Sequence, residues 1–144
     1  MVFWFKDKEV SLRLYREVSP EEDEDGILDL IYWIYVGKHT CVGYCDLRVG
    51  AMCESLYYAG QLGYHVFKPF RGHSYAYKAC LLLFEIARKK GMKELLITCS
   101  PDNIPSKKTL IKLGGNYVDT VPVPENHYLY ERGETVKEIY RFDL

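Results

Sequence analysis

The spacing of apolar residues changes midway along the chain, and this change constrains the fold more than any other feature. In the first half, apolar and polar residues alternate, as in Val10–Glu17, which is typical of a half-buried strand. From Ser74 to Lys90, apolar residues instead recur every three and four positions, which predicts an amphipathic helix. Gly91 follows as a natural helix end. The sequence therefore predicts an α+β fold in which several strands precede the first long helix.

The remaining elements follow from the same periodicities and from turn residues. A second helix is expected to begin at Asp102 or Asn103 and to end before Gly114-Gly115. Gly50–Leu56 and Glu125–Arg132 show no clear pattern. We expect the other strands at Ile27–Val36, Cys41–Val49 with a bulge at Gly43, Tyr57–Phe67, Glu94–Cys99, Asn116–Val123 and Thr135–Phe142. This order predicts one domain over residues 1–144, with a mixed, mostly antiparallel sheet of about six or seven strands and two main helices packed on it.

Charge and hydropathy exclude some classes of function. The net charge is −1, whereas nucleic-acid-binding domains usually carry a basic excess, so we expect no nucleic-acid partner. The acidic run Glu21–Asp25 is expected to form a solvated turn, with a docking patch for a cationic substrate as the alternative. The chain has neither the apolar length of a signal peptide nor a run of about 18 apolar residues, so we expect a cytoplasmic protein without a membrane span.

The cysteines indicate free thiols and not a disulfide framework. There are five of them, an odd number, and none forms a C-x-x-C pair. The histidines do not cluster at the spacing of zinc ligands, so we expect no metal. Free thiols fit a reducing compartment.

The segment His65–Ala76 is the best candidate for a binding site. A strand is expected to end near Phe67, a loop containing Pro69 and Gly72 follows, and a helix begins near Ser74. The first turn of a helix has unpaired backbone N–H groups and a partial positive charge, so such a corner can hold a phosphate group. The pattern is neither a P-loop nor a Rossmann fingerprint, and on pattern alone an ordinary strand–turn–helix corner is equally consistent with it.

Two sets of residues resemble the GNAT superfamily of acyl-CoA-dependent acyltransferases. Its R/Q-x-x-G-x-G/A motif is matched by Arg71–Ala76, with Pro69 upstream. About thirty residues later the family has an Asn, then Ala or Ser three residues on, then a glycine that closes the helix, which correspond here to Asn103, Ser106 and Gly114. The resemblance is good from about Tyr58 to Gly115, and it implies a GNAT-like fold.

The resemblance also implies a cosubstrate, acetyl-CoA, and the residues that bind it. The pantetheine arm would pair with the strand end near Val66–Lys68, where a backbone N–H would stabilise the tetrahedral oxyanion. The loop would hold the pyrophosphate, and the second helix would contribute an amide, a hydroxyl and a lysine, with Lys108 a further candidate. The implied cofactor-binding residues are Val66, Phe67, Lys68, Arg71, Gly72, His73, Ser74, Tyr75, Ala76, Asn103, Ser106 and Lys107.

The chain departs from the family pattern at three places. Ser74 replaces the middle glycine of the loop, and as a serine it is expected to start the helix as an N-cap. Leu110 stands where many members have the tyrosine that protonates the departing thiolate. Only Ser19–Gly26 occupies the region in which the family usually has one or two helices, so we expect an acceptor pocket that is open, or built by the C-terminal half or a partner subunit.

Amine acceptors are mostly protonated at neutral pH, because their pKa is about 10, so a base is needed before attack. Gln61 occupies the glutamate position of a related E-x-G-Y pattern but cannot itself be a base. His65 has a suitable side chain on the same strand, although a histidine with only a structural role is equally compatible with the sequence. The catalytic candidates are His65, Tyr64 and Gln61, with Tyr44 and Glu54 as further candidates; Cys99 is expected to be a core residue.

The sequence thus predicts an N-acetyltransferase that transfers an acetyl group from acetyl-CoA to a primary amine by direct attack. The acceptor would be a small-molecule or peptide amine, and the short acceptor region makes a homodimer plausible. The first alternative is a module that binds acyl-CoA without turnover. The glutamine at Gln61 and the missing tyrosine at Leu110 favour this alternative. A second alternative is an interaction domain that has lost the ligand, which Ser74 would favour, and a cysteine-dependent hydrolase is a more distant third.

Overall fold

The structure is a computed structural model that describes residues 4–6 and 9–144. Its contacts divide the chain into two compact units. The first comprises the residues up to Ala51 together with Leu62–Met92, and the second comprises Met52–Gln61 together with Lys93–Leu144. We describe each unit by itself, and the single domain expected over residues 1–144 stays a prediction.

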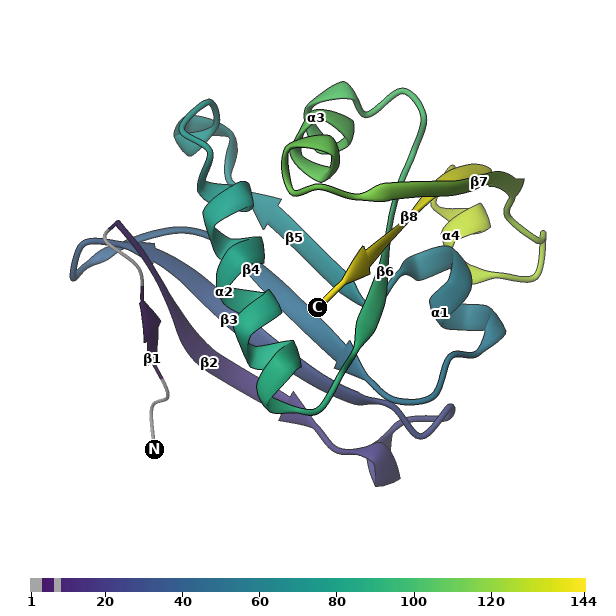
Figure 1. The fold of residues 1–144 in the computed structure, drawn as a ribbon, viewed down its shortest axis with the longest axis horizontal. Coiled ribbons are helices and arrows are strands. Elements are labelled where there is room, and N and C mark those ends of the chain that lie inside the picture. Colours follow the sequence, from purple (N-terminus) through teal and green to yellow (C-terminus); the bar gives the residue numbers. More distant parts are fainter. Residues whose placement is uncertain (1–3, 7–8) are drawn as a thin grey trace. The chain divides into compact units, whose positions relative to one another are not determined.

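The first unit is built around a five-stranded antiparallel sheet whose strands follow in the order β1-β2-β3-β4-β5 (Figure 1). Sequential neighbours pair along the whole sheet, so β5 is its last strand. The strands are β1 (Trp4–Lys6), β2 (Val10–Val18), β3 (Leu28–Val36), β4 (Thr40–Val49) and β5 (Leu62–Val66), and a 3-10 turn, η1 (Pro20–Glu22), lies between β2 and β3. The acidic run therefore forms a turn, in which Asp23 accepts backbone hydrogen bonds from Asp25 and Ile27.

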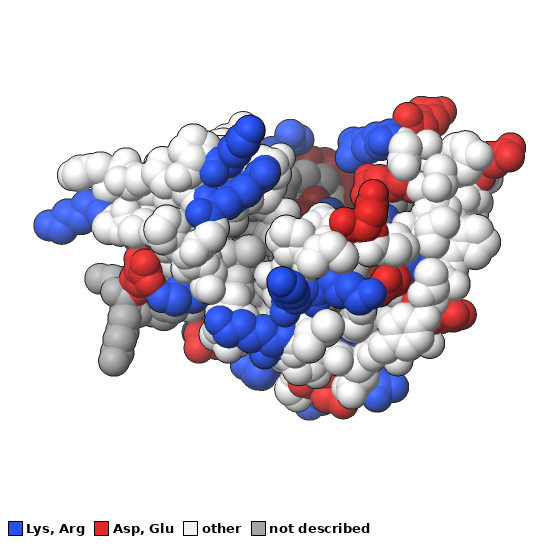
Figure 2. All heavy atoms as spheres, turned by 90° about the horizontal axis from the view of Figure 1, so that it is seen from above, with Lys and Arg blue, Asp and Glu red and all other residues white. Residues whose placement is uncertain are grey.

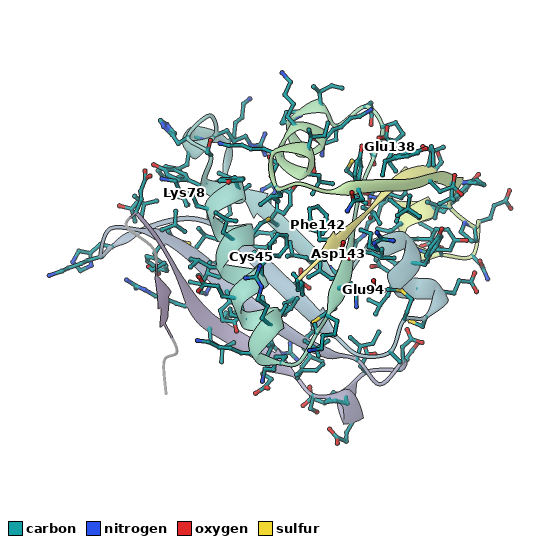
Figure 3. The ribbon with its side chains drawn as sticks, in the orientation of Figure 1. Cys45, Lys78, Glu94, Glu138, Phe142 and Asp143 are labelled. Atoms are coloured by element: carbon teal, nitrogen blue, oxygen red, sulfur yellow. The ribbon has the colours of Figure 1, made fainter. Side chains whose placement is uncertain are left out.

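One helix, α2 (Tyr75–Lys89), covers one face of this sheet (Figure 1). Its apolar stripe buries Ala79, Cys80 and Leu83 completely. On the sheet, Cys45 lies in the core beneath α2 (Figure 3). Burial raises the pKa of Cys45 and of Cys80, so both remain neutral apolar-like groups in the core.

A bulge in β4 brings β5 close. Ile34 on β3 pairs with Gly43, but the next residue, Tyr35, pairs with Cys41, so Val42 is the additional residue of β4. A side chain at Gly43 would place its Cβ 2.1 Å from the carbonyl oxygen of His65, so only glycine allows this approach. The bulge expected at Gly43 is confirmed, and it shapes the strand pair that carries His65.

The second unit contains a three-stranded antiparallel sheet in the order β6-β8-β7, so the last strand of the chain lies at its centre. Its strands are β6 (Glu94–Cys99), β7 (Asn116–Pro122) and β8 (Val136–Asp143), and its helices are α1 (Glu54–Ala59), α3 (Ile104–Lys112) and α4 (Tyr128–Glu131). Four consecutive residues of β8, from Lys137 to Tyr140, are buried because neighbouring strands flank it on both sides.

The α+β class with antiparallel strands is confirmed, with three differences from the expected layout. The described strands form two hydrogen-bonded sheets, and the short β1 was not foreseen. Tyr57–Phe67 is not one strand, because its first residues belong to α1. Gly60 ends α1 with a φ of 79°, and its N–H donates to the carbonyl of Leu56, so the chain turns there before β5 begins.

Among residues 4–6 and 9–144, no helix is both long and apolar enough to cross a bilayer. The same part of the chain contains no group of three or more His, Cys, Asp or Glu residues placed to hold a metal ion.

Candidate functional site

The loop between β5 and α2 is the most exposed part of the predicted binding segment. It contains a 3-10 turn, η2 (Lys68–Phe70), which Arg71 follows with extended backbone before the chain turns into α2. The side chain of Arg71 folds back, and its Nε donates to the carbonyl oxygen of Val66 at 3.0 Å. This contact ties the loop to the end of β5. The exposed residues are Lys68, Pro69, Arg71, Gly72, His73 and Ser74, while Tyr75 and Ala76 are half-buried.

Ser74 has the left-handed conformation, with φ 62° and ψ 25°. Within the described residues it is the one non-glycine residue with positive φ, and Gly72 has a φ of 90° two positions earlier. Because the left-handed region is unfavourable for residues with a Cβ, a glycine would adopt this backbone more easily. Ser74 directly precedes the first residue of α2, as expected for a helix start, but its side chain makes no capping hydrogen bond, because a residue that caps a helix through its side chain normally has extended backbone.

β5 presents backbone groups on the side away from β4. Phe67 N–H donates to the carbonyl of Val42, and His65 is paired with Tyr44 across the strands. In an antiparallel pair, alternate residues direct their N–H and C=O groups to opposite sides. The backbone groups of Val66 therefore point away from β4, and Arg71 reaches its carbonyl from that side.

His65 lies on the sheet face opposite α2, in a row of aromatic side chains. Its ring is exposed and lies 5.2 Å from Tyr44 and 5.9 Å from Phe67, measured between ring centroids. The row continues across the sheet, with 6.3 Å from Tyr44 to Trp33 and 5.1 Å from Trp33 to Tyr15. Tyr15 is 60% exposed and Tyr44 is 44% exposed, so much of this aromatic row faces solvent.

Two carboxyl groups lie on the same face of the sheet, further along β3 and β4 than the aromatic row. Asp46 accepts from Nε of Arg48 at 2.9 Å and lies over Gly63, where an added Cβ would be 2.6 Å from its Oδ1. Asp29, which pairs with Arg48 across the strands, has a buried Oδ1 with no hydrogen-bond partner among the described residues. Burial, with a hydrogen bond to Asp46 and the negative charge of Asp46, raises the pKa of Asp29 to about 8.

Sequence reasoning missed this carboxyl pair. Asp29 and Asp46 are far apart in the chain, and each looks like an ordinary polar position of an alternating strand. A usable signal was the glycine of the Gln61–Tyr64 segment, because a strand glycine marks a place where another group approaches closely.

In the second unit, the expected cofactor residues of α3 already have partners. Asn103 Oδ1 caps the helix by accepting from the N–H of Ser106 at 3.3 Å, which confirms the predicted helix start. The ammonium group of Lys107 donates to Oε1 of Glu138 at 3.1 Å. Leu110, at the tyrosine position of the family, is completely buried and serves the core.

Glu138 is the polar centre of this unit. It lies on β8 (Figure 3), is only 7% exposed, and also accepts from the hydroxyl of Tyr140 at 2.9 Å. Burial and this hydrogen bond raise the pKa of Tyr140, so its hydroxyl keeps its proton. A hollow of about 520 Å³ opens beside this group and is lined by Lys107, Ile111, Gly115, Tyr117, Thr120, Glu138 and Tyr140.

Two further candidates have clear structural tasks. Gln61 is buried, and its side-chain oxygen accepts from the N–H of Leu96 at 2.9 Å while its backbone N–H donates to the carbonyl of Leu96. Cys99 is 3% exposed, and burial raises its pKa, which keeps it a thiol and speaks against a cysteine nucleophile. Tyr64 is half-buried on β5, and its catalytic role stays a prediction.

The surface charges are mixed. On the face drawn in Figure 2, Lys and Arg side chains are interspersed with Asp and Glu.

Comparison with solved structures identifies acetyltransferases of the same fold. RimL, a ribosomal L7/L12 alpha-N-protein acetyltransferase, has a TM-score of 0.72 at 14% identity, over 100% of this chain and 96% of that one. A putative ribosomal-protein-serine acetyltransferase from Vibrio cholerae has a TM-score of 0.70 at 15% identity, over 99% and 98%. The microcin C7 self-immunity acetyltransferase MccE, solved with acetyl-CoA and AMP, has a TM-score of 0.63 at 20% identity; the match covers 81% of this chain and 61% of that one.

No protein with a curated description matches the chain. The sequence profile described as "Acetyltransferase (GNAT) domain" matches residues 2–116, which is well over half of the chain. Together with the α+β architecture and the strand–loop–helix corner between β5 and α2, this match shows that the chain belongs to the GNAT acetyltransferase domain family.

Proposed function

We propose that the protein is an N-acetyltransferase that transfers the acetyl group of acetyl-CoA directly to a primary amine. The observation that carries the proposal is the exposed corner between β5 and α2, in which two positions with positive φ, Gly72 and Ser74, precede the long helix. Such a backbone directs N–H groups outward at a helix N-terminus, where the helix dipole favours anions. The pyrophosphate of acetyl-CoA is the anion that the family membership suggests.

The pantetheine arm would lie along the edge of β5. The backbone groups of Val66 face away from β4 and are available for strand-like pairing with the amides of the arm. Nε of Arg71 donates to the Val66 carbonyl, so binding would exchange this contact for one to the cosubstrate. In this arrangement a backbone N–H of β5 would stabilise the oxyanion that forms when the amine attacks the thioester.

The acceptor class is suggested by the neighbours. RimL is described as a ribosomal L7/L12 alpha-N-protein acetyltransferase, and MccE was solved in complex with acetyl-CoA and AMP. A peptide or small-molecule amine is therefore the proposed acceptor. The proposed cosubstrate site also includes Asn103, Ser106 and Lys107. To bind the cosubstrate, Asn103 has to leave or share its contact with the N–H of Ser106, and Lys107 its contact with Glu138.

Titration calorimetry with acetyl-CoA tests the proposal directly. We expect binding in the micromolar range, with CoA binding similarly and ATP much more weakly, because ATP lacks the pantetheine arm. Absence of acetyl-CoA binding at millimolar concentration would contradict the proposal. Thiol release with a panel of amines then separates an enzyme from a module that binds the cosubstrate without turnover. The second reading is compatible with Gln61 and Leu110, which are buried at the positions of the expected base and acid.

His65→Ala tests the base expected on β5. Because the His65 ring is exposed and beside Tyr44, its removal should leave the sheet intact and acetyl-CoA affinity within about twofold. If His65 takes the proton of the amine, kcat should fall by about 100-fold. His39→Ala, at an exposed position of the β3–β4 turn, is the matched control. Equal turnover of both variants and the wild type would remove His65 as a base.

A further inference from the structure

The outer face of the five-stranded sheet, opposite α2, combines two features, of which the proposed cosubstrate site uses only Phe67. One is the aromatic row Tyr15, Trp33, Tyr44, His65 and Phe67, in which the centroids of neighbouring rings lie 5.1–6.3 Å apart. The other is the carboxyl pair Asp29–Asp46, which shares one guanidinium, that of Arg48. Both belong to the first unit, and both lie on the strands that lead to β5.

The aromatic row is a surface for a flat or apolar group. Tyr15, Tyr44 and His65 are exposed, and three of the ring pairs in the row meet edge to face, which leaves ring faces on which a ligand can stack. A monomeric soluble protein rarely leaves a contiguous surface of this kind exposed without a partner. Within the described residues of the first unit, α2 is the one helix of several turns, and it covers the opposite face.

The carboxyl pair lies next to this surface. On β4, Tyr44 and Asp46 are alternate residues and thus share a face, and Asp46 extends over β5 where Gly63 has no side chain. Asp46 is held by two contacts to Arg48, from Nε at 2.9 Å and from a terminal nitrogen at 3.3 Å. This holds a carboxylate over β5, two residues before His65.

The two carboxyl groups of the pair are matched by only one positive charge. When both carboxyls are ionised they carry two negative charges, but the contacts provide only one guanidinium, and Oδ1 of Asp29 is buried without a partner. The other groups that act on Asp29 are Asp46, which is close enough to hydrogen-bond, and Asp23 in the preceding turn, both of which oppose its ionisation, while Arg48 favours it. The pair is therefore ready to take up one positive charge, either as a proton or as an ammonium group.

We propose that this outer face binds the acceptor, a primary amine on an aromatic or apolar body, and that the Asp29–Asp46 pair, in place of His65, accepts the proton of its ammonium group. This inference rests on the proposed acetyl transfer. The inference adds a base to that reaction. The strands β3 and β4 supply the carboxylate, since the residue at the glutamate position Gln61 is a buried glutamine.

The reaction balances without a further reactant. One N–H bond of the ammonium breaks, and its proton moves to the ionised carboxyl pair, which becomes singly protonated. The freed lone pair of the amine forms the C–N bond to the thioester carbonyl, and the C–S bond then breaks. CoA leaves as a thiolate, and the second proton released from nitrogen neutralises it.

A binding experiment tests the surface without acetyl-CoA. The chain has two tryptophans, so Trp4→Phe leaves Trp33 as the single indole whose fluorescence reports on the outer face. The probes are 2-phenylethylamine, 2-phenylethanol and ethylamine. At pH 9 we expect 2-phenylethylamine to quench Trp33 at concentrations at least tenfold lower than either of the other probes, since only it has both the ring and the charge.

Substitutions then separate the two features. In the same background, Asp29→Asn keeps the size of the side chain and should weaken 2-phenylethylamine by about tenfold at pH 9, with no change for 2-phenylethanol. Tyr44→Ala should weaken both ring probes. Asp25→Asn, which removes an exposed carboxylate of the acidic turn, is the matched control and should change neither. Equal binding of the amine and the alcohol, or of the wild type and Asp29→Asn, would overturn the inference.

A turnover experiment tests the proton transfer. For 2-phenylethylamine, kcat/KM of the wild type should rise through an apparent pKa near 8, in addition to the rise due to the amine itself. Asp29→Asn should lose the component near 8 and about 100-fold in kcat, with acetyl-CoA affinity unchanged by calorimetry. An unchanged profile in Asp29→Asn would overturn the role of the pair. If the wild type fails to bind acetyl-CoA, the proposed acetyl transfer fails, while the fluorescence titration still decides whether this face binds the amine.

Discussion

The loop Phe67–Tyr75 of the first unit and the start of α3 in the second unit were both expected to bind the cosubstrate, yet they differ in how their polar groups are used. The loop is exposed, and its helix start has no side-chain cap. At α3, Asn103 caps the helix and Lys107 is paired with the buried Glu138. A family motif therefore specifies a position on the fold, but only the surroundings decide whether a polar group there is available to a ligand.

The largest expected effect concerns the loop. Ser74→Trp introduces a large side chain at the exposed helix start and should weaken acetyl-CoA by about 100-fold or more, because the backbone N–H groups of the loop become inaccessible. Calorimetry measures the affinity, and thermal unfolding checks that the fold persists.

Ser74→Gly is the matched control at the same position. Glycine adopts φ 62° without steric cost, so the control should bind acetyl-CoA as the wild type does. It should also unfold at a slightly higher temperature, corresponding to about 1 kcal/mol. Wild-type affinity for acetyl-CoA in Ser74→Trp would show that the loop does not bind the cosubstrate. The proposed difference between the loop and the start of α3 would then be wrong.

The next effect concerns the buried pair in the second unit. Lys107→Met removes the ammonium group and leaves Glu138 buried with the hydroxyl of Tyr140, so we expect a loss of about 2 kcal/mol in the free energy of unfolding. If the task of Lys107 is structural, acetyl-CoA affinity should change less than threefold.

Lys108→Met is the control for this pair, since Lys108 is exposed on the same helix. It should cost less than about 0.5 kcal/mol. A tenfold or larger loss of acetyl-CoA affinity in Lys107→Met, without one in Lys108→Met, would instead mean that Lys107 exchanges Glu138 for a CoA phosphate.

The smallest effect concerns the helix cap. Asn103→Ala removes the acceptor for the N–H of Ser106 and should lower the free energy of unfolding by about 1 kcal/mol. Asn103→Asp, which can also cap, should retain most of the stability. Chemical denaturation measures both. A neutral Asn103→Ala combined with weaker acetyl-CoA binding would show that the amide serves the ligand and not the helix.

Much of the fold could be predicted because it depends on short-range periodicity. The alternation in Val10–Glu17 and the three-and-four spacing in Ser74–Lys90 located β2 and α2 within one residue at each end. The segment Tyr57–Phe67 could not be assigned in this way. Its tyrosines are compatible with both strand and helix, and the break depends on the conformation of Gly60.

The candidate site was predictable only in part. Motif spacing located the loop and the start of α3, and it singled out Ser74 as a departure from the family. That Ser74 itself adopts the left-handed backbone of the missing glycine is a property of the folded chain. Asp29, in contrast, had no local signal, because its surroundings come from β4 and the acidic turn.

By itself, the sequence determined the α+β class, the position of most helices and strands, and the family, because each of these depends on patterns within a few tens of residues. Only the tertiary structure decided the division into two sheets, the pairing of Lys107 with Glu138 and the meeting of Asp29 with Asp46 over Gly63. The physical reason is that strand register and helix packing place residues from distant segments together, and the resulting burial and charge then set which groups are engaged and which remain available.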